Sequence, residues 1–202
     1  VDVGMQNPAV ASDGTSLKLS PKLPRLQRRL KVAQRRMSKK KFASKNYCKQ
    51  KLRKQRIQIR INNLRNDAIH KFTSRLAKNH GIIGIEALNI AGMHKSPIKN
   101  IRAGFQRSCM VEVLRQLKYK AVECVEAPRN FPSTQLCSAC GSRQKMAIQD
   151  RTYKCPACSS ELPRDLNSAI NLKNYVGTVS PEHMPVEGRV HSVRMRPEEA
   201  PL

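Results

Sequence analysis

Two closely spaced cysteine pairs constrain this sequence more than any other feature. Cys137 and Cys140 form one C-x-x-C knuckle, Cys155 and Cys158 form a second, and 14 residues lie between them. Each knuckle places two sulfurs on one side of a tight turn, and a short hairpin can join the pairs into a tetrahedral site. Zn²⁺ suits such a site, and its role is expected to be structural because protein fills all four positions. The alternative is two disulfides or unrelated cysteines.

The remaining cysteines and the absence of targeting features favour a reducing, cytoplasmic location. The chain has seven cysteines, and Cys48, Cys109 and Cys124 stand apart from the two knuckles as ordinary buried or neutral residues. An odd number of cysteines without a signal peptide favours a metal site over a disulfide scaffold. No apolar stretch approaches the ~20 residues that span a bilayer, so no membrane association is expected.

The charge of the chain predicts a nucleic-acid partner. Lys and Arg number 39 against 14 Asp and Glu, a formal net charge of +25. Residues 18–78 hold 22 of the basic residues and a single acid, Asp67. A solvated helix face usually carries both signs of charge, whereas a charge run of one sign favours contact with phosphates.

Apolar residues within this basic region recur at helical spacing, which predicts a long helical hairpin over residues 18–80. Leu26, Leu30 and Ala33 indicate the first helix, and a longer series from Ile57 to Leu76 indicates the second. The basic side chains that we expect to contact nucleic acid are Arg28, Arg29, Arg35, Arg36, Lys39, Lys40, Lys41, Lys45, Arg53, Lys54, Arg56 and Arg60.

The rest of the chain alternates strand and helix patterns, which predicts an α/β fold. Residues 1–4 read as the end of a strand, and residues 16–20 as its returning partner after the Asp13-Gly14 turn. Short apolar runs predict strands at 81–86 and 121–125.

Helices are expected over 101–117 and 165–175, on the spacing of their apolar residues. A proline-containing tail from Gly177 is expected to be flexible.

Three acids occupy positions that suit metal-dependent chemistry. Asp2 lies in the first strand, Glu86 ends another, and Asp165 opens the last helix. Each also has an ordinary explanation: Asp2 as a loop acid, Glu86 as a strand-end residue that faces water, and Asp165 as a helix N-cap. Together they could supply the converging carboxylates that bind Mg²⁺ or Mn²⁺ for phosphodiester cleavage.

Four segments in this order resemble the TnpB (OrfB) family of transposon-encoded proteins, relatives of type V CRISPR nucleases. Residues 1–4, 84–89 and 164–172 resemble its three RuvC motifs, and residues 131–141 resemble the entry to its zinc ribbon. The spacing also fits, since 84 residues separate Asp2 from Glu86 and 79 separate Glu86 from Asp165.

The resemblance implies an RNase H-like (RuvC-like) fold with a mixed sheet, flanking helices and an inserted zinc ribbon. The core would comprise residues 1–130 and 162–176, the ribbon 131–161 and the tail 177–202. It also implies a catalytic role for Asp2, Glu86 and Asp165, and cleavage of DNA guided by RNA. Family members carry further N-terminal domains, so the chain is expected to be truncated and inactive alone if Asp2 is not held in place.

Two functions remain open from the sequence. The first is a Mg²⁺-dependent DNA endonuclease of the RuvC type, whose cleavage would disappear in Glu86→Ala. The second is a non-catalytic DNA- or RNA-binding zinc-ribbon protein, whose salt-sensitive binding would not depend on the three acids. The sequence sets neither the guide RNA, the host nor the oligomeric state.

Overall fold

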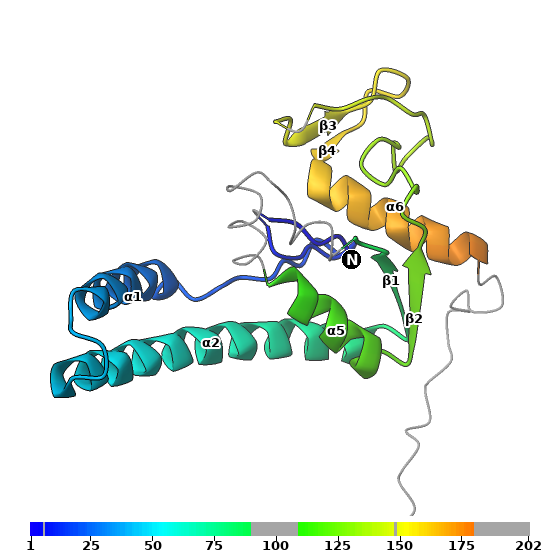
Figure 1. Ribbon diagram of the computed structural model, residues 1–202. Coiled ribbons are helices and arrows are strands. Elements are labelled where there is room, and N and C mark those ends of the chain that lie inside the picture. Colours follow the sequence, from blue (N-terminus) through cyan, green and yellow to red (C-terminus); the bar gives the residue numbers. More distant parts are fainter. Residues whose placement is uncertain (6, 90–108, 148, 180–202) are drawn as a thin grey trace, which may run out of the picture.

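A computed structural model describes residues 1–5, 7–89, 109–147 and 149–179 of the chain. The described part is a mixed α/β structure in which helices predominate (Figure 1). Its helices are α1 (Leu23–Ser38), α2 (Lys45–Asn79), α5 (Met110–Lys120) and α6 (Arg164–Val179). Its strands are β1 (Ile82–Glu86), β2 (Glu123–Ala127), β3 (Thr152–Lys154) and β4 (Glu161–Pro163).

The predicted basic hairpin is formed by α1 and α2, which lie side by side over the N-terminal half of α2 (Figure 1). Pro24 lies in the first turn of α1, where its missing N–H removes no helical hydrogen bond. Ser44 caps α2 by accepting a hydrogen bond from Tyr47 N at 3.2 Å. A small separate core joins the two helices, formed by Leu23, Leu26, Ala33, Ile57 and Ile61. The helical periodicity therefore predicted both helices, although α2 begins at Lys45, before the predicted apolar series starts at Ile57.

β1 and β2 pair in parallel, with Ile82 opposite Glu123 and Glu86 opposite Ala127. Figure 1 shows this small sheet between α6 on one side and α5 with the C-terminal half of α2 on the other. Ile83 and Ile85 point into the main core with α2 and α5. Gly84 faces α6, and a Cβ there would lie 2.5 Å from Val176 Cγ2 and 2.9 Å from Leu172 O. Glycine at this position therefore allows helix and strand to approach closely.

The N-terminal segment is less regular than the two strands predicted there. Its pairing is limited to isolated bridges, from Asp2 to Val10 and from Val10 to Ser16. Pro8 has no N–H to donate, which limits the length of a ladder beside it. The segment is nevertheless tied to the sheet, because the amino group of Val1 donates to Gly84 O at 2.6 Å. Val1, Val3, Ala9, Ala11 and Leu17 are buried in the main core.

The last two predicted helices also differ in part from the structure. α5 ends at Lys120 rather than Leu117, and the predicted residues 101–108 lie outside the described part of the chain. α6 continues through Val179, past the predicted start of the tail at Gly177. The remainder of that tail, residues 180–202, also lies outside the described residues. None of the described helices is both long and apolar enough to cross a membrane.

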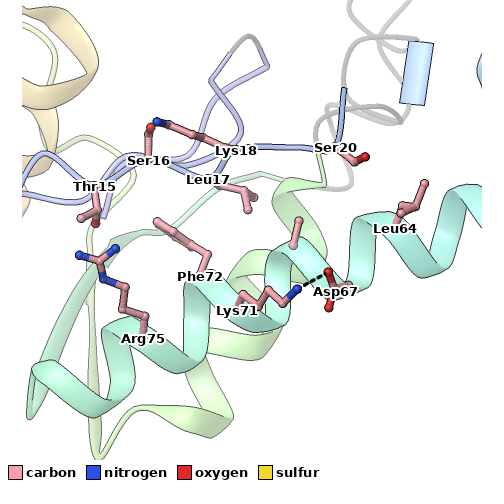
Figure 2. Close-up of a pocket in the computed structure, with 11 residues that line it drawn as sticks. Thr15, Ser16, Leu17, Lys18, Ser20, Leu64, Asp67, Lys71, Phe72 and Arg75 are labelled. Atoms are coloured by element: carbon pink, nitrogen blue, oxygen red, sulfur yellow. Dashed lines mark hydrogen bonds and ion pairs between the residues drawn. The ribbon is translucent and has the colours of Figure 1, made fainter. Parts of the chain in front are cut away.

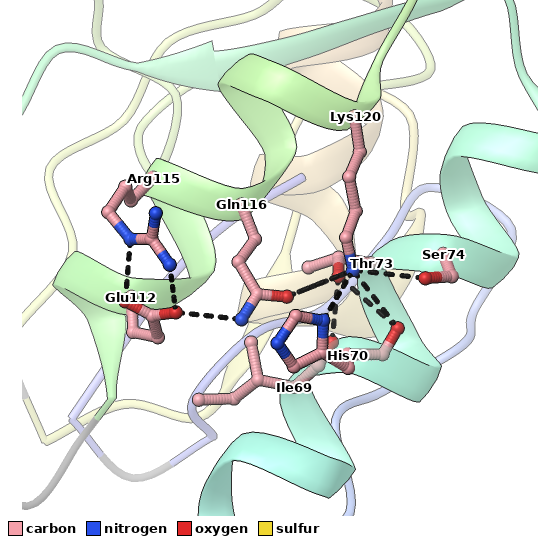
Figure 3. A network of polar contacts seen from close by, with 8 residues as sticks. All are labelled: Ile69, His70, Thr73, Ser74, Glu112, Arg115, Gln116 and Lys120. Carbon is pink, nitrogen blue, oxygen red and sulfur yellow. Dashed lines mark hydrogen bonds and ion pairs between the residues drawn. The ribbon is translucent and has the colours of Figure 1, made fainter.

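A polar network fixes the position of α5 on α2 (Figure 3). The buried Thr73 hydroxyl donates to Gln116 Oε1 at 2.9 Å, and Gln116 Nε2 donates to Glu112 Oε1 at 2.7 Å. Lys120 Nζ closes the network by donating to Thr73 Oγ1 at 2.8 Å. Hydrogen bonds from Arg115 lower the pKa of Glu112 to about 2, so this carboxylate is charged at neutral pH. The buried side chains of Thr73 and Gln116 therefore both have partners, which favours one register of the two helices.

Candidate functional site

The four cysteines of the two knuckles form a compact cluster. Their sulfurs all lie within 4.8 Å of one another, and the Cys137–Cys158 and Cys140–Cys155 pairs are each 3.6 Å apart. The knuckles have matching turns: Cys137 N donates to Ser142 O at 2.8 Å, and Cys155 N donates to Ser160 O at 2.9 Å. The equivalent residues Gly141 and Ser159 both have positive φ, at 73° and 57°.

This geometry fits a tetrahedral metal site and contradicts the disulfide alternative. All four cysteines are free thiols. Four sulfurs at about 2.3 Å from a central Zn²⁺ would be about 3.8 Å apart, close to the distances observed. The backbone N–H of Cys158 lowers the pKa of the Cys155 thiol to about 6, which favours the thiolate that binds metal. The donor set of four sulfurs therefore fits zinc.

Two buried asparagines of α6 attach the cysteine module to the rest of the fold. Asn167 Oδ1 accepts from Ser138 N at 2.9 Å, and its Nδ2 donates to Leu136 O at 2.7 Å. Asn171 Nδ2 donates to Ser133 O and to Leu136 O, both at 2.8 Å. Since Leu136 and Ser138 flank Cys137, these amides fix the first knuckle directly against α6.

The three predicted carboxylates come from different elements that converge beside this attachment. Asp2 lies on the bridged N-terminal segment, Glu86 is the last residue of β1, and Asp165 lies in the first turn of α6. Val1 is bonded to β1, and Asn7 Nδ2 donates to Asp165 Oδ2 at 2.6 Å. The N-terminal segment therefore contacts the elements that carry the other two acids.

The electrostatics of the three acids are those of a like-charged cluster. Burial, followed by the charges of Asp165 and Glu86, raises the pKa of Asp2 from 3.8 to about 7. Burial also raises the pKa of Glu86 above its usual value. Within the described residues, only the four cysteines form a group of three or more ligands with donor atoms this close together. The carboxylates thus interact electrostatically but are more widely spaced than the sulfurs.

The twelve predicted nucleic-acid-binding side chains all lie on α1, α2 and the turn that joins them. All are exposed except Lys54, which is half-buried. A hollow of about 490 Å³ opens between the two helices, lined by Arg29, Lys49, Leu52, Arg53, Arg56 and Ile57. Four cations around one hollow form a positive surface suited to phosphate.

A second groove of about 400 Å³ lies between residues 15–20 and α2 (Figure 2). Figure 2 shows Lys18, Lys71 and Arg75 around it, together with the hydroxyls of Thr15 and Ser16. Lys71 neutralises Asp67 at 2.8 Å, so Lys18 and Arg75 leave the groove with net positive charge. Basic surface therefore extends from the hairpin toward the sheet.

The sequence does not single out Asn7 or Asn171 as site residues. For Asn167, in the Arg-Asp-Leu-Asn segment, the sequence leaves open contact with nucleic acid or support of the site, and it favours support. Asn167 and Asn171 are four residues apart and therefore share one face of the predicted helix, which was an available signal for two amides with a common partner.

Two family comparisons match this chain in separate regions. The OrfB_IS605 family, described as "Probable transposase", matches residues 1–97. The family described as "Cas12f1-like, TNB domain" matches residues 112–172, which include the four cysteines and Asp165.

Individual relatives agree with these matches. The chain is 34% identical to a "Putative RNA-guided DNA endonuclease" of Mycobacterium tuberculosis, over 87% of this chain and 41% of the relative. It is 33% identical to "Putative RNA-guided DNA endonuclease InsQ" of Escherichia coli, over 85% of this chain and 47% of the relative. A relative of the same description in Streptomyces pristinaespiralis is 31% identical, over 85% of this chain and 43% of the relative. The chain thus matches less than half the length of these relatives.

Proposed function

Since the chain belongs to the OrfB (TnpB) family of transposon-encoded proteins, we propose that it carries the DNA-cleaving core of an RNA-guided endonuclease. The convergence of Asp2, Glu86 and Asp165 is the observation that carries the proposal. These acids are 84 and 79 residues apart along the chain, yet the charges of Glu86 and Asp165 both act on Asp2. Separated acids that gather on apolar elements favour a functional site over three unrelated surface residues.

We assign the core to an RNase H-like fold. Backbone bonds and bridges connect Ser16 to Val10, Val10 to Asp2 and Val1 to Gly84, and β1 then pairs with β2. These segments would form a single mixed sheet with α2, α5 and α6 around it. In this assignment residues 1–130 and 162–176 form the core, 18–80 its basic hairpin, 131–161 the zinc ribbon and 177–202 a tail.

The three acids suit a divalent cation. Carboxylate oxygens are the ligands that Mg²⁺ and Mn²⁺ prefer, and positive charge would offset the burial and the repulsion that together raise the pKa of Asp2. A bound cation would supply water activation and neutralisation of the leaving oxygen. The chain itself orients the carboxylates: Asn7 holds Asp165, and Gly84 lets β1, which ends at Glu86, approach α6 closely.

The cysteine cluster would hold a structural zinc and the hairpin would hold nucleic acid. All four sulfurs are needed for a closed site, which leaves no position for substrate. The exposed cations of α1 and α2 would contact the phosphates of DNA and, in a longer protein, those of a guide RNA. Zinc-bound thiolates and transposon DNA both suit an intracellular location.

Cleavage of single-stranded DNA by the zinc-loaded chain in Mg²⁺ or Mn²⁺ tests the nuclease. We expect Glu86→Ala to reduce the cleavage rate at least 100-fold, because the cluster loses one of its three metal ligands. Glu161→Ala is the matched control, since Glu161 is an exposed acid paired with Lys154 on the ribbon. It should leave the rate unchanged.

The wider spacing of the carboxylates favours one alternative, a binding module that does not cleave. Equal cleavage by the parent chain and Glu86→Ala would exclude the assigned site. A folded, zinc-bound chain that binds DNA but never cuts it would identify the alternative as the function of this chain.

A further inference from the structure

The turn between α1 and α2 carries an unusually exposed aromatic side chain. Phe42 is 80% exposed and packs only partly on Tyr47, with ring centroids 5.2 Å apart and planes inclined at 57°. We call residues 39–47 the hairpin tip. A phenyl ring in water is costly, since apolar surface favours burial by about 25 cal/mol per Å². The tip therefore favours a partner that covers this ring.

The tip holds the ring on an ordered turn. Lys40 N donates to Met37 O at 3.1 Å, and Ser44 N donates to Lys41 O at 3.2 Å. The Ser44 hydroxyl also donates to Lys41 O at 2.8 Å while its oxygen caps α2. Ala43 has a φ of 59°, a left-handed conformation that completes the reversal of the chain. Because the turn is hydrogen-bonded on both sides, little order has to be created when a ligand binds.

Positive charge surrounds the ring. Lys39, Lys40, Lys41 and Lys45 are all exposed, and the sequence contains no acid between residues 18 and 66. A basic protein surface would be repelled by this tip and a neutral one would gain no attraction from its charge, whereas a phosphate backbone would be attracted. The combination of cations with an exposed aromatic face is the arrangement by which proteins hold single strands.

Other exposed apolar residues of the hairpin lack the aromatic ring. Leu52 and Ile59 on α2 are 55% and 57% exposed, but they are aliphatic and present no π face to a base. The rings of Phe42 and Tyr47 lie together at the tip. Figure 1 shows the turn between α1 and α2 at the end of the hairpin that lies away from the sheet.

We infer that the hairpin tip is a stacking site for an unpaired nucleobase, with Phe42 against the base and the lysines on the flanking phosphates. The ligand is single-stranded nucleic acid, either RNA or DNA. The inference rests on the proposed binding of nucleic acid by the hairpin, but not on the carboxylates. A 35-residue α2 spans roughly 50 Å, so the tip is a contact well separated from the cleavage site.

Binding of a short single strand to the zinc-loaded chain, without divalent cations, tests the tip. The oligonucleotide carries one 2-aminopurine, whose fluorescence is quenched when the base stacks. We expect Phe42→Ala to weaken binding roughly tenfold and to abolish the quenching, while Phe42→Trp retains both. The salt dependence should stay unchanged, since every lysine is retained.

The controls separate stacking from general loss of apolar surface. Ile59→Ala removes an exposed aliphatic side chain from α2 and should leave affinity and quenching unchanged. A fully paired duplex should bind Phe42→Ala as tightly as it binds the parent chain. Separate measurements with RNA and with DNA of the same sequence identify which single strand is preferred.

Binding to anionic phosphatidylserine vesicles is measured in parallel. Three results would overturn the inference: Phe42→Ala binds the single strand as tightly as the parent chain does, it weakens duplex binding equally, or it weakens only the binding to vesicles. The first two would deny stacking, and the third would make the tip a membrane contact. Repeating the binding measurement in Glu86→Ala separates the two proposals, because stacking at Phe42 should persist even where cleavage is absent.

Discussion

Buried amides determine how two parts of this protein are joined. Asn167 and Asn171 are buried on α6 and together make four hydrogen bonds to the segment around the first knuckle. A buried polar side chain is costly unless its groups are paired, so such residues indicate a specific partner. Because Asp165 lies two residues before Asn167, the same amides also hold the start of α6 relative to the carboxylates.

At the residue scale we predict that Asn167→Ala destabilises the chain. The substitution leaves the half-buried Ser138 N–H without its acceptor, which costs about 1–3 kcal/mol. Thermal unfolding should shift down by roughly 2–12 °C for a chain of this size. Asn174→Ala on the same helix is the control, because its amide is exposed and lies 3.5 Å from Ser138 O. Lost cleavage with unchanged stability would instead make Asn167 part of the chemistry.

Among the elements, the ribbon and the helical hairpin differ in what stabilises them. Among the described residues of the ribbon, the core contains only Cys137, Tyr153 and Cys155, with Met146 packed against them. Two of these three residues are themselves predicted metal ligands, so little apolar burial remains without the metal. The hairpin has its own core between α1 and α2, and no ribbon residue contributes to it.

Zinc removal should therefore unfold the ribbon and leave the hairpin helical. A thiol-blocking reagent should release one zinc per chain. The amides that then lose protection from hydrogen exchange should be confined to residues around β3 and β4. The far-UV circular dichroism of the helices should change little. Cys48→Ser should retain one zinc, since Cys48 is exposed and far from the cluster, whereas Cys140→Ser should lose it. Full zinc occupancy in Cys140→Ser would contradict the four-sulfur site.

At the scale of the whole molecule, the positive charge of the described residues is concentrated at one end. α1, α2 and the turn between them extend away from the sheet and the ribbon, and they carry the twelve exposed or half-buried cations predicted to bind nucleic acid (Figure 1). The three carboxylates lie at the other end, on the bridged N-terminal segment, β1 and α6. Nucleic acid held by the hairpin would thus be directed toward acids that would otherwise repel its phosphates.

The salt dependence of binding tests this separation. Replacing Arg35, Lys40 and Lys45 with Gln should reduce the slope of log K against log salt by about 2–3, if each contacts one phosphate. The same change in net charge made at Lys145, Lys154 and Lys173, which are exposed outside the hairpin, should leave the slope nearly unchanged. Equal effects of the two triple variants would mean that net charge, and not the hairpin, governs binding.

The sequence by itself determined the features that depend on neighbouring residues. The C-x-x-C spacing predicted the four-sulfur cluster, because the turn that pairs two thiols is complete within each knuckle. Apolar periodicity likewise predicted α1, α2 and most of α6, since helical hydrogen bonds join residues only four apart. The strands at β1 and β2 followed from short apolar runs for the same reason.

Only the tertiary structure decided which distant residues meet. Asp2, Glu86 and Asp165 interact because the N-terminal segment bonds to β1 and Asn7 bonds to Asp165, contacts that no local pattern contains. The partners of Asn167 lie 29 and 31 residues away, across the ribbon. Gly84 appeared in the sequence as part of an apolar run, yet its role is the close approach of α6. Such contacts depend on how whole elements pack, and packing is set by shapes and partners that are separated in the sequence.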